Sequence, residues 1–140
     1  MTFLEVLTAI SNVATAIAVG VAAWQLVLNK KQAVTNFEDS FAKQYRELIA
    51  NIPLEIFFGD VLSEEKYQEC FDEIYRYLDL CNEQIFLYKI GRISEATWQF
   101  WVAGISENLS KPVFQRAWVE IAEKTKGNFS ELREFFPPQK

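Results

Sequence analysis

Residues 6–28 read VLTAISNVATAIAVGVAAWQLVL and contain no charged side chain. A helix of these 23 residues is roughly 34 Å long, which is enough to cross a hydrocarbon core of about 30 Å. Glu5 precedes the run, and Lys30 and Lys31 follow it. Because the run is too long and too free of charge for a half-exposed helix, the sequence predicts a membrane-spanning helix.

Three other kinds of helix share part of this pattern. The first is a buried core helix of a soluble protein, which stays open as an alternative to the membrane span. A signal peptide has a basic start and an apolar run of about 7–15 residues, whereas residues 1–5 contain no Lys or Arg. Val21-Ala22-Ala23 resembles a cleavage site, but we expect the segment to be retained. An interfacial helix has a charged face, which this run lacks.

The charges beside the run predict its orientation. Lys30 and Lys31 follow it directly, and no basic side chain precedes it, so the positive-inside rule places the C-terminal part in the cytoplasm. We therefore expect a single-pass protein of the inner membrane with its N-terminus outside. Cys70 and Cys81 agree with a reducing compartment, because about 16 Å of helical rise between them prevents a disulfide.

The sequence predicts two parts: residues 1–31 as the transmembrane helix, and residues 32–140 as one small cytoplasmic domain. This domain has 12 Lys and Arg against 18 Asp and Glu. So acidic a domain is not expected to bind nucleic acid through a general phosphate-tracking surface.

Periodicity and helix-end signals predict that the cytoplasmic part is all-α. The span is expected to continue as an amphipathic helix to about Asn51, because Pro53 stops it. The further elements expected are a short turn over 53–59, a Ser63-capped helix from Glu64 to about Ile90, a Ser94-capped helix, a helix from Pro112 that Gly127 stops, and a last helix over 130–136.

A stripe of small and polar residues lies on one side of the span. The predicted packing or pore face consists of Thr8, Ser11, Asn12, Thr15, Ala16 and Gly20. Small residues allow close helix approach, and the Asn12 amide would lack a partner in lipid. These features predict a homo-oligomer; the alternative is a monomer that tolerates mild polarity. Phe37, Phe41 and Tyr45 are expected to pack between subunits.

Residues that could carry chemistry are scarce. The chain has no histidine, which excludes Ser-His and Cys-His catalysis, and we expect no metal, no cofactor and no enzymatic activity. Glu69, Asp72 and Glu73 share a helix face. Such an acidic face is more commonly a solvated surface than a cation-binding site. Trp98, Trp101 and Trp118 are predicted core residues. Arg92, beside Gly91, is the candidate contact for a partner.

Three stretches carry a resemblance: Tyr77–Gln84, Gly91–Ser94 and Trp98–Ile105. They resemble a family of short bacterial proteins in which one span precedes a small cytoplasmic helical domain, and the likeness covers roughly residues 63–136. The architecture is also similar to the membrane accessory protein of type VI-B CRISPR systems. That similarity implies an oligomeric, pore-like assembly in antiphage defence. Nuclease-like domains of such proteins pair an Arg with a catalytic His, which this chain lacks.

Two functions follow as expectations. The first is an oligomeric membrane effector or pore-like protein, with the bilayer and further copies of the chain as its partners. The second is a membrane-tethered adaptor that recruits a cytoplasmic protein.

Overall fold

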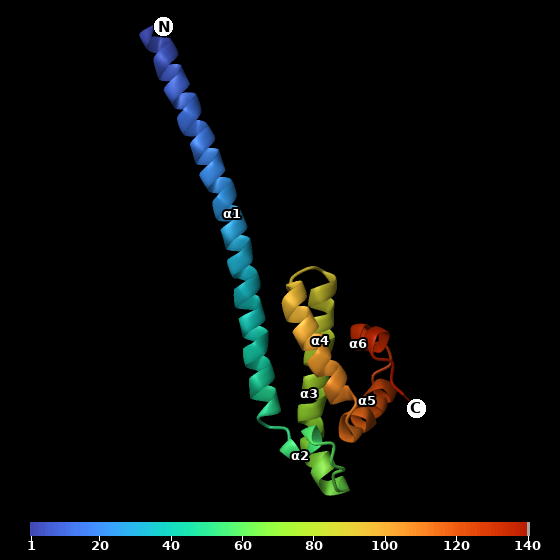
Figure 1. Cartoon of the computed structure of the whole chain (residues 1–140). Helices are drawn as coiled ribbons and strands as arrows, with labels where there is room; N and C mark the ends of the chain where they lie inside the picture. The colour runs from blue at the N-terminus through green and yellow to red at the C-terminus, as the bar shows by residue number, and fades with distance from the viewer. Residues whose placement is uncertain (140) are drawn as a thin grey trace. The chain divides into compact units, whose positions relative to one another are not determined.

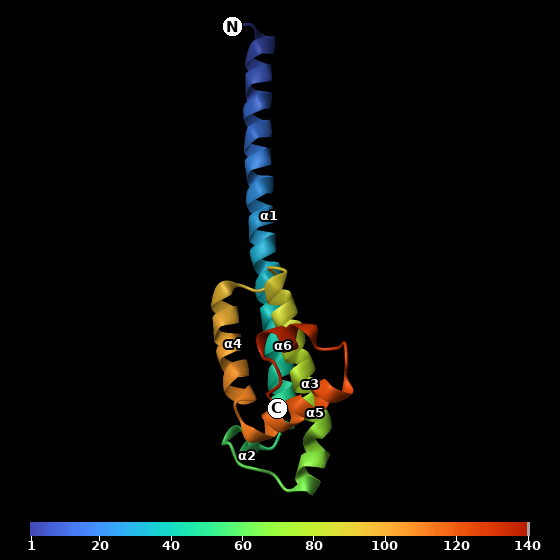
Figure 2. The same ribbon diagram turned by 90° about the vertical axis from the view of Figure 1, so that its right-hand side faces the viewer.

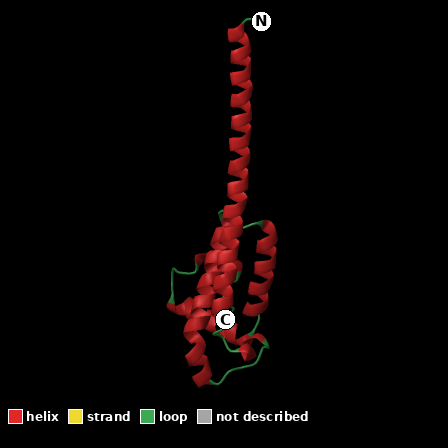
Figure 3. Cartoon of the chain, turned by 90° about the vertical axis from the view of Figure 1, so that its left-hand side faces the viewer, coloured by secondary structure: helices red, strands yellow, loops and turns green. Residues whose placement is uncertain are grey.

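The computed structural model describes residues 1–139, which form helices joined by short loops with no β-strand among them (Figure 3). The helices are α1 (Phe3–Ile49), α2 (Leu54–Phe57), α3 (Glu64–Lys89), α4 (Glu95–Leu109), α5 (Pro112–Lys124) and α6 (Ser130–Phe135), as Figure 1 shows. The prediction of an all-α chain is confirmed.

The chain divides into two compact units, Met1–Asn36 and the residues from Phe37 onward. The first unit consists mostly of the N-terminal part of α1, the only helix in residues 1–139 that is long and apolar enough to cross a membrane. Its most apolar 18-residue window has a mean hydropathy of 1.9, and none of it is buried. Soluble core helices and signal sequences can meet the same length and composition criteria, but a core helix is mostly buried. The predicted boundary after residue 31 stays a prediction.

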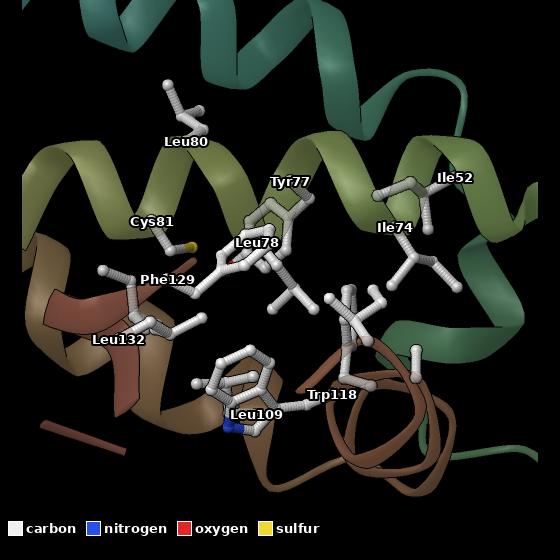
Figure 4. Close-up of a cluster of buried hydrophobic side chains, with 14 of the residues drawn as sticks. Ile52, Ile74, Tyr77, Leu78, Leu80, Cys81, Leu109, Trp118, Phe129 and Leu132 are labelled. Carbon is white, nitrogen blue, oxygen red and sulfur yellow. The ribbon is translucent and has the colours of Figure 1, made fainter. Parts of the chain in front are cut away.

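The second unit is built around α3. Helices α4, α5 and α6 pack against α3, and α5 also packs against α2 and α4. Helices α3 and α4 run antiparallel and are joined by a short turn (Figures 1 and 2). Figure 4 shows side chains of α3, α5 and α6 meeting in one apolar cluster, which includes Leu78, Trp118 and Leu132.

Local signals explain where these helices begin and end. The hydroxyl of Ser63 accepts a hydrogen bond from Lys66 N at 3.4 Å, and that of Ser94 accepts one from Thr97 N at 3.3 Å. Helix α3 ends in a Schellman motif, in which Arg92 N donates to Leu87 O and Gly91 N donates to Tyr88 O, both at 2.9 Å. Gly91 has φ +72°, which costs a glycine little. The predicted caps at Ser63 and Ser94 are confirmed.

Helix α3 is buried along two rows of side chains. The first row consists of Tyr67, Ile74, Leu78, Cys81 and Ile85, and the second row of Cys70, Tyr77, Leu80, Gln84 and Leu87. In Figure 4, Leu80 extends from the side of α3 that lies away from the labelled cluster. The neighbours on this side include the end of α1, because the rings of Tyr45 and Tyr77 lie 6.2 Å apart.

Two predictions about aromatic residues need correction. Phe41 was expected to pack between subunits, but only 4% of it is exposed and its ring lies 5.9 Å from that of Trp101 in the same chain. Phe37 and Tyr45 also pack against this core. Trp98 and Trp118 are buried as predicted, whereas Trp101 is only half-buried and packs against the edge of the core.

Candidate functional site

The predicted face of the span is fully exposed on α1. Thr8, Ser11, Asn12, Thr15, Ala16 and Gly20 are all exposed. The hydroxyl of Thr8 donates to Leu4 O, and that of Thr15 donates to Ser11 O, each at 2.8 Å. These two hydroxyls are therefore satisfied inside the helix. Neither the amide of Asn12 nor the hydroxyl of Ser11 forms a side-chain hydrogen bond within residues 1–139, so both need an external partner in an apolar environment, and the amide is the larger polar group of the two.

Small residues on the same helix leave room for a close neighbour. A Cβ atom added at Gly20 would meet no heavy atom within 4 Å. Ala16 lies one turn earlier, which makes a small-xxx-small pair with Gly20. The isolated chain therefore gives Gly20 no packing role of its own.

The predicted anchor and contact residues are accessible. Lys30 and Lys31 are exposed on α1 just after the apolar run. Arg92 is exposed in the turn between α3 and α4, where the Schellman motif fixes its backbone. Its role as a partner contact stays a prediction.

Among residues 1–139, no cluster of three or more His, Cys, Asp or Glu side chains could hold a metal ion. The thiols of Cys70 and Cys81 are free and buried, and burial raises the pKa of Cys81 to about 12. A thiol protonated at neutral pH is a poor nucleophile. Burial also raises the pKa of Cys70, and both cysteines are part of the buried apolar core.

Glu38 links α1 to α4 within the second unit. Its carboxylate accepts hydrogen bonds from Ser94 N at 2.7 Å and from the Thr97 hydroxyl at 2.8 Å. A carboxylate at a helix N-terminus also interacts favourably with the helix dipole. Partial burial, the largest single influence, raises the pKa of Glu38, but the hydrogen bonds from Ser94 and Thr97 outweigh it, and the pKa is lowered from 4.5.

We expect Glu38→Ala to lower the free energy of unfolding by about 1 kcal/mol at neutral pH, the usual cost of a lost helix cap. Because the folded-state pKa of Glu38 is lowered, its contribution is fully present above pH 4.5 and is lost as the pH falls through the folded value. Denaturant titrations at several pH values should therefore show a gap between wild type and variant that narrows below pH 4.5. The exposed neighbour Asp39 is the matched control, and an equal loss in Asp39→Ala would contradict the cap.

A groove that the sequence did not predict lies between α1, α3 and α4 in the second unit. Its volume is about 480 Å³. Its lining residues include Tyr45 and Arg46 of α1, Tyr77 and Gln84 of α3, and Trp101 of α4. One sequence signal for it exists, since Gln84 falls seven residues after Tyr77 in the second buried row of α3.

Comparison of the chain with protein-family models, with curated proteins and with solved structures gave no match in any of the three.

Proposed function

We propose that this chain is a single-pass protein of the inner membrane that assembles into an oligomeric, pore-like effector. The observation that carries the proposal is the exposed N-terminal part of α1. It is apolar and free of charge over residues 6–28, and the chain itself covers none of its most apolar window. Lipid covers the apolar side chains of such a helix, but it offers no partner to the Asn12 amide. A neighbouring copy of the chain, or water along the axis of an oligomer, would supply a hydrogen-bond partner for this amide.

Orientation follows from the charges that flank the span. By the positive-inside rule, Lys30 and Lys31 favour a cytoplasmic location for the helical domain, and the buried, free thiols of Cys70 and Cys81 agree with a reducing compartment. The role in antiphage defence rests only on the architectural similarity to the membrane accessory protein of type VI-B CRISPR systems.

A membrane-tethered adaptor is the second candidate, and one observation favours it. Leu54, Phe58 and Val61 are exposed by 64%, 71% and 80%, and they lie close together in α2 and the loop that follows. Large apolar side chains grouped in this way are typical of a surface that binds a protein partner. Arg92 would serve the same purpose at the α3–α4 turn.

One experiment in two stages tests the proposal. Membranes from expressing cells are first washed with carbonate, and we expect the chain to stay in the membrane while a reporter fused after residue 140 behaves as cytoplasmic. Recovery in the soluble fraction would end the membrane interpretation.

The retained protein is then solubilised in detergent and its mass is measured. A closed ring of roughly six subunits or more supports the effector, because a closed ring of spans has an axis that can hold water. A monomer or a dimer would contradict the effector and favour the adaptor.

A further inference from the structure

The groove between α1, α3 and α4 is large enough to hold a small molecule. Its volume of about 480 Å³ falls in the range typical of ligand sites. Small residues help to keep the space open, since Ala42 of α1 and Ala103 and Gly104 of α4 are among the residues that line it. A Cβ atom added at Gly104 would meet no heavy atom within 4 Å, so this wall is open.

Gln84 is the buried polar residue among those that line this groove. Only 4% of the residue is exposed, yet its amide forms no side-chain hydrogen bond within residues 1–139. The other buried polar groups nearby are paired, since Asn108 Nδ2 donates to the Tyr77 hydroxyl at 2.8 Å. No fully enclosed side-chain nitrogen or oxygen in this part of the chain lacks a partner, so the amide of Gln84 must be reached from the groove.

The chemistry of the lining restricts the ligand. A glutamine amide offers a donor and an acceptor side by side, which match a ligand with adjacent C=O and N–H groups. The aromatic side chains of Tyr45, Phe100 and Trp101 line the groove and favour a flat ring.

The charges at the groove favour an anionic substituent on the α1 side. The guanidinium of Arg46 is exposed and forms no ion pair within residues 1–139. The carboxylate of Glu107 lines the α4 side, with Lys111 Nζ at 3.9 Å from it. A negative group on the ligand is therefore attracted to Arg46 on the α1 side, whereas on the α4 side the charge of Glu107 is offset by Lys111.

We propose that this groove binds a planar ring that carries adjacent C=O and N–H groups and an anionic substituent, with the ring against the aromatic residues, the amide edge on Gln84 and the anion on Arg46. Six-membered cyclic ureides with a carboxylate or phosphate group belong to this class. The site lies wholly in the second unit, so the proposal does not depend on membrane assembly.

Orotate and uridine 5′-monophosphate are suitable probes, because both carry the ureide edge and an anion. Binding to the full chain in detergent is measured by calorimetry and by ligand-observed NMR. We expect at least one probe to bind saturably with a Kd below about 1 mM. Uracil, which has no anion, should bind more weakly.

Three variants test the assigned contacts. Gln84→Leu should weaken binding by about tenfold or more, and removing the unpaired amide should not reduce stability. Arg46→Gln should weaken binding of the anionic probes while leaving the affinity for uracil unchanged. Gly104→Leu should abolish binding by filling the groove, and it should keep or raise stability because leucine favours a helix more than glycine does.

Arg92→Gln is the matched control for Arg46→Gln, because Arg92 is another exposed arginine and does not line the groove. The absence of saturable binding by both probes at 1 mM would overturn the proposal. Unchanged affinity in Gly104→Leu would overturn it too, because the ligand would then lie elsewhere. The affinity measured with Gly104→Leu tests the proposal even if Gln84→Leu fails to fold.

Discussion

Replacing Trp98 with Ala is expected to lower the free energy of unfolding by about 3–5 kcal/mol, the usual cost of truncating a buried tryptophan. Trp98 is 3% exposed. Its ring stacks on that of Tyr88 at a centroid distance of 4.3 Å and meets Phe135 edge-on at 5.7 Å. Truncation to Ala therefore removes contacts among α3, α4 and the end of α6 in one step.

Denaturant unfolding of the full chain in detergent, followed by far-UV circular dichroism, measures this loss. Trp101→Ala is a useful comparison. Because Trp101 is half-buried, its replacement should lower the free energy of unfolding by less than that of Trp98. Trp24→Ala is the control, since Trp24 is 68% exposed and lies outside the second unit. If Trp98→Ala left stability unchanged while removing a biological effect, Trp98 would belong to a partner surface instead.

The helices of this chain were predictable because their ends carry strong local signals. Serine caps, Pro53, Pro112 and the positive-φ Gly91 each act within a few residues, so the sequence around them is sufficient to place a boundary. The apolar run of residues 6–28 likewise predicts a helix from its own composition.

The groove and the α1 contacts were not predictable in the same way. The position of Gln84 on α3 is visible in the sequence, but the open space beside it depends on how far α1 and α4 lie from α3. Phe41 could equally have faced another subunit, because an apolar face does not specify what covers it. Its burial against Trp101 is a result of tertiary packing.

The backbone conformation of Phe129 could not be predicted from the local sequence either. It has φ +59°, a left-handed conformation that local rules would assign to Gly127 or Asn128. Its ring is 5% exposed and packs edge-on against Tyr75 at 5.4 Å and Trp118 at 5.8 Å. Tertiary packing thus holds a backbone conformation that the local sequence disfavours.

Replacing Asn12 with Leu is expected to reduce the size of the detergent-solubilised assembly while leaving membrane insertion intact. An interhelical amide contact contributes about 1–2 kcal/mol in model peptides and about 0.6 kcal/mol in a measured membrane protein. That loss recurs at each interface of a ring. Insertion should persist because leucine is among the residues that most favour the bilayer.

Gly20→Leu tests the same face by steric exclusion. In the isolated chain the new side chain meets open space, and leucine favours the helix by about 1 kcal/mol over glycine, so the monomer should be at least as stable. At a small-xxx-small contact with Ala16, however, a leucine holds the neighbouring helix away. Val13→Leu is the control, because Val13 is exposed on α1 but lies outside the predicted face.

The masses of the wild type and of the three variants, Asn12→Leu, Gly20→Leu and Val13→Leu, decide whether Asn12 belongs to an assembly face or is merely tolerated. If the mass falls in Asn12→Leu and Gly20→Leu but not in Val13→Leu, the polar stripe is an assembly face, and the effector is supported. If Asn12→Leu keeps the wild-type mass and the wild-type permeability of the membrane, the amide is tolerated polarity. The adaptor would then be the better explanation of the chain, because its proposed binding surface lies in the second unit and needs only a tether from the N-terminal helix.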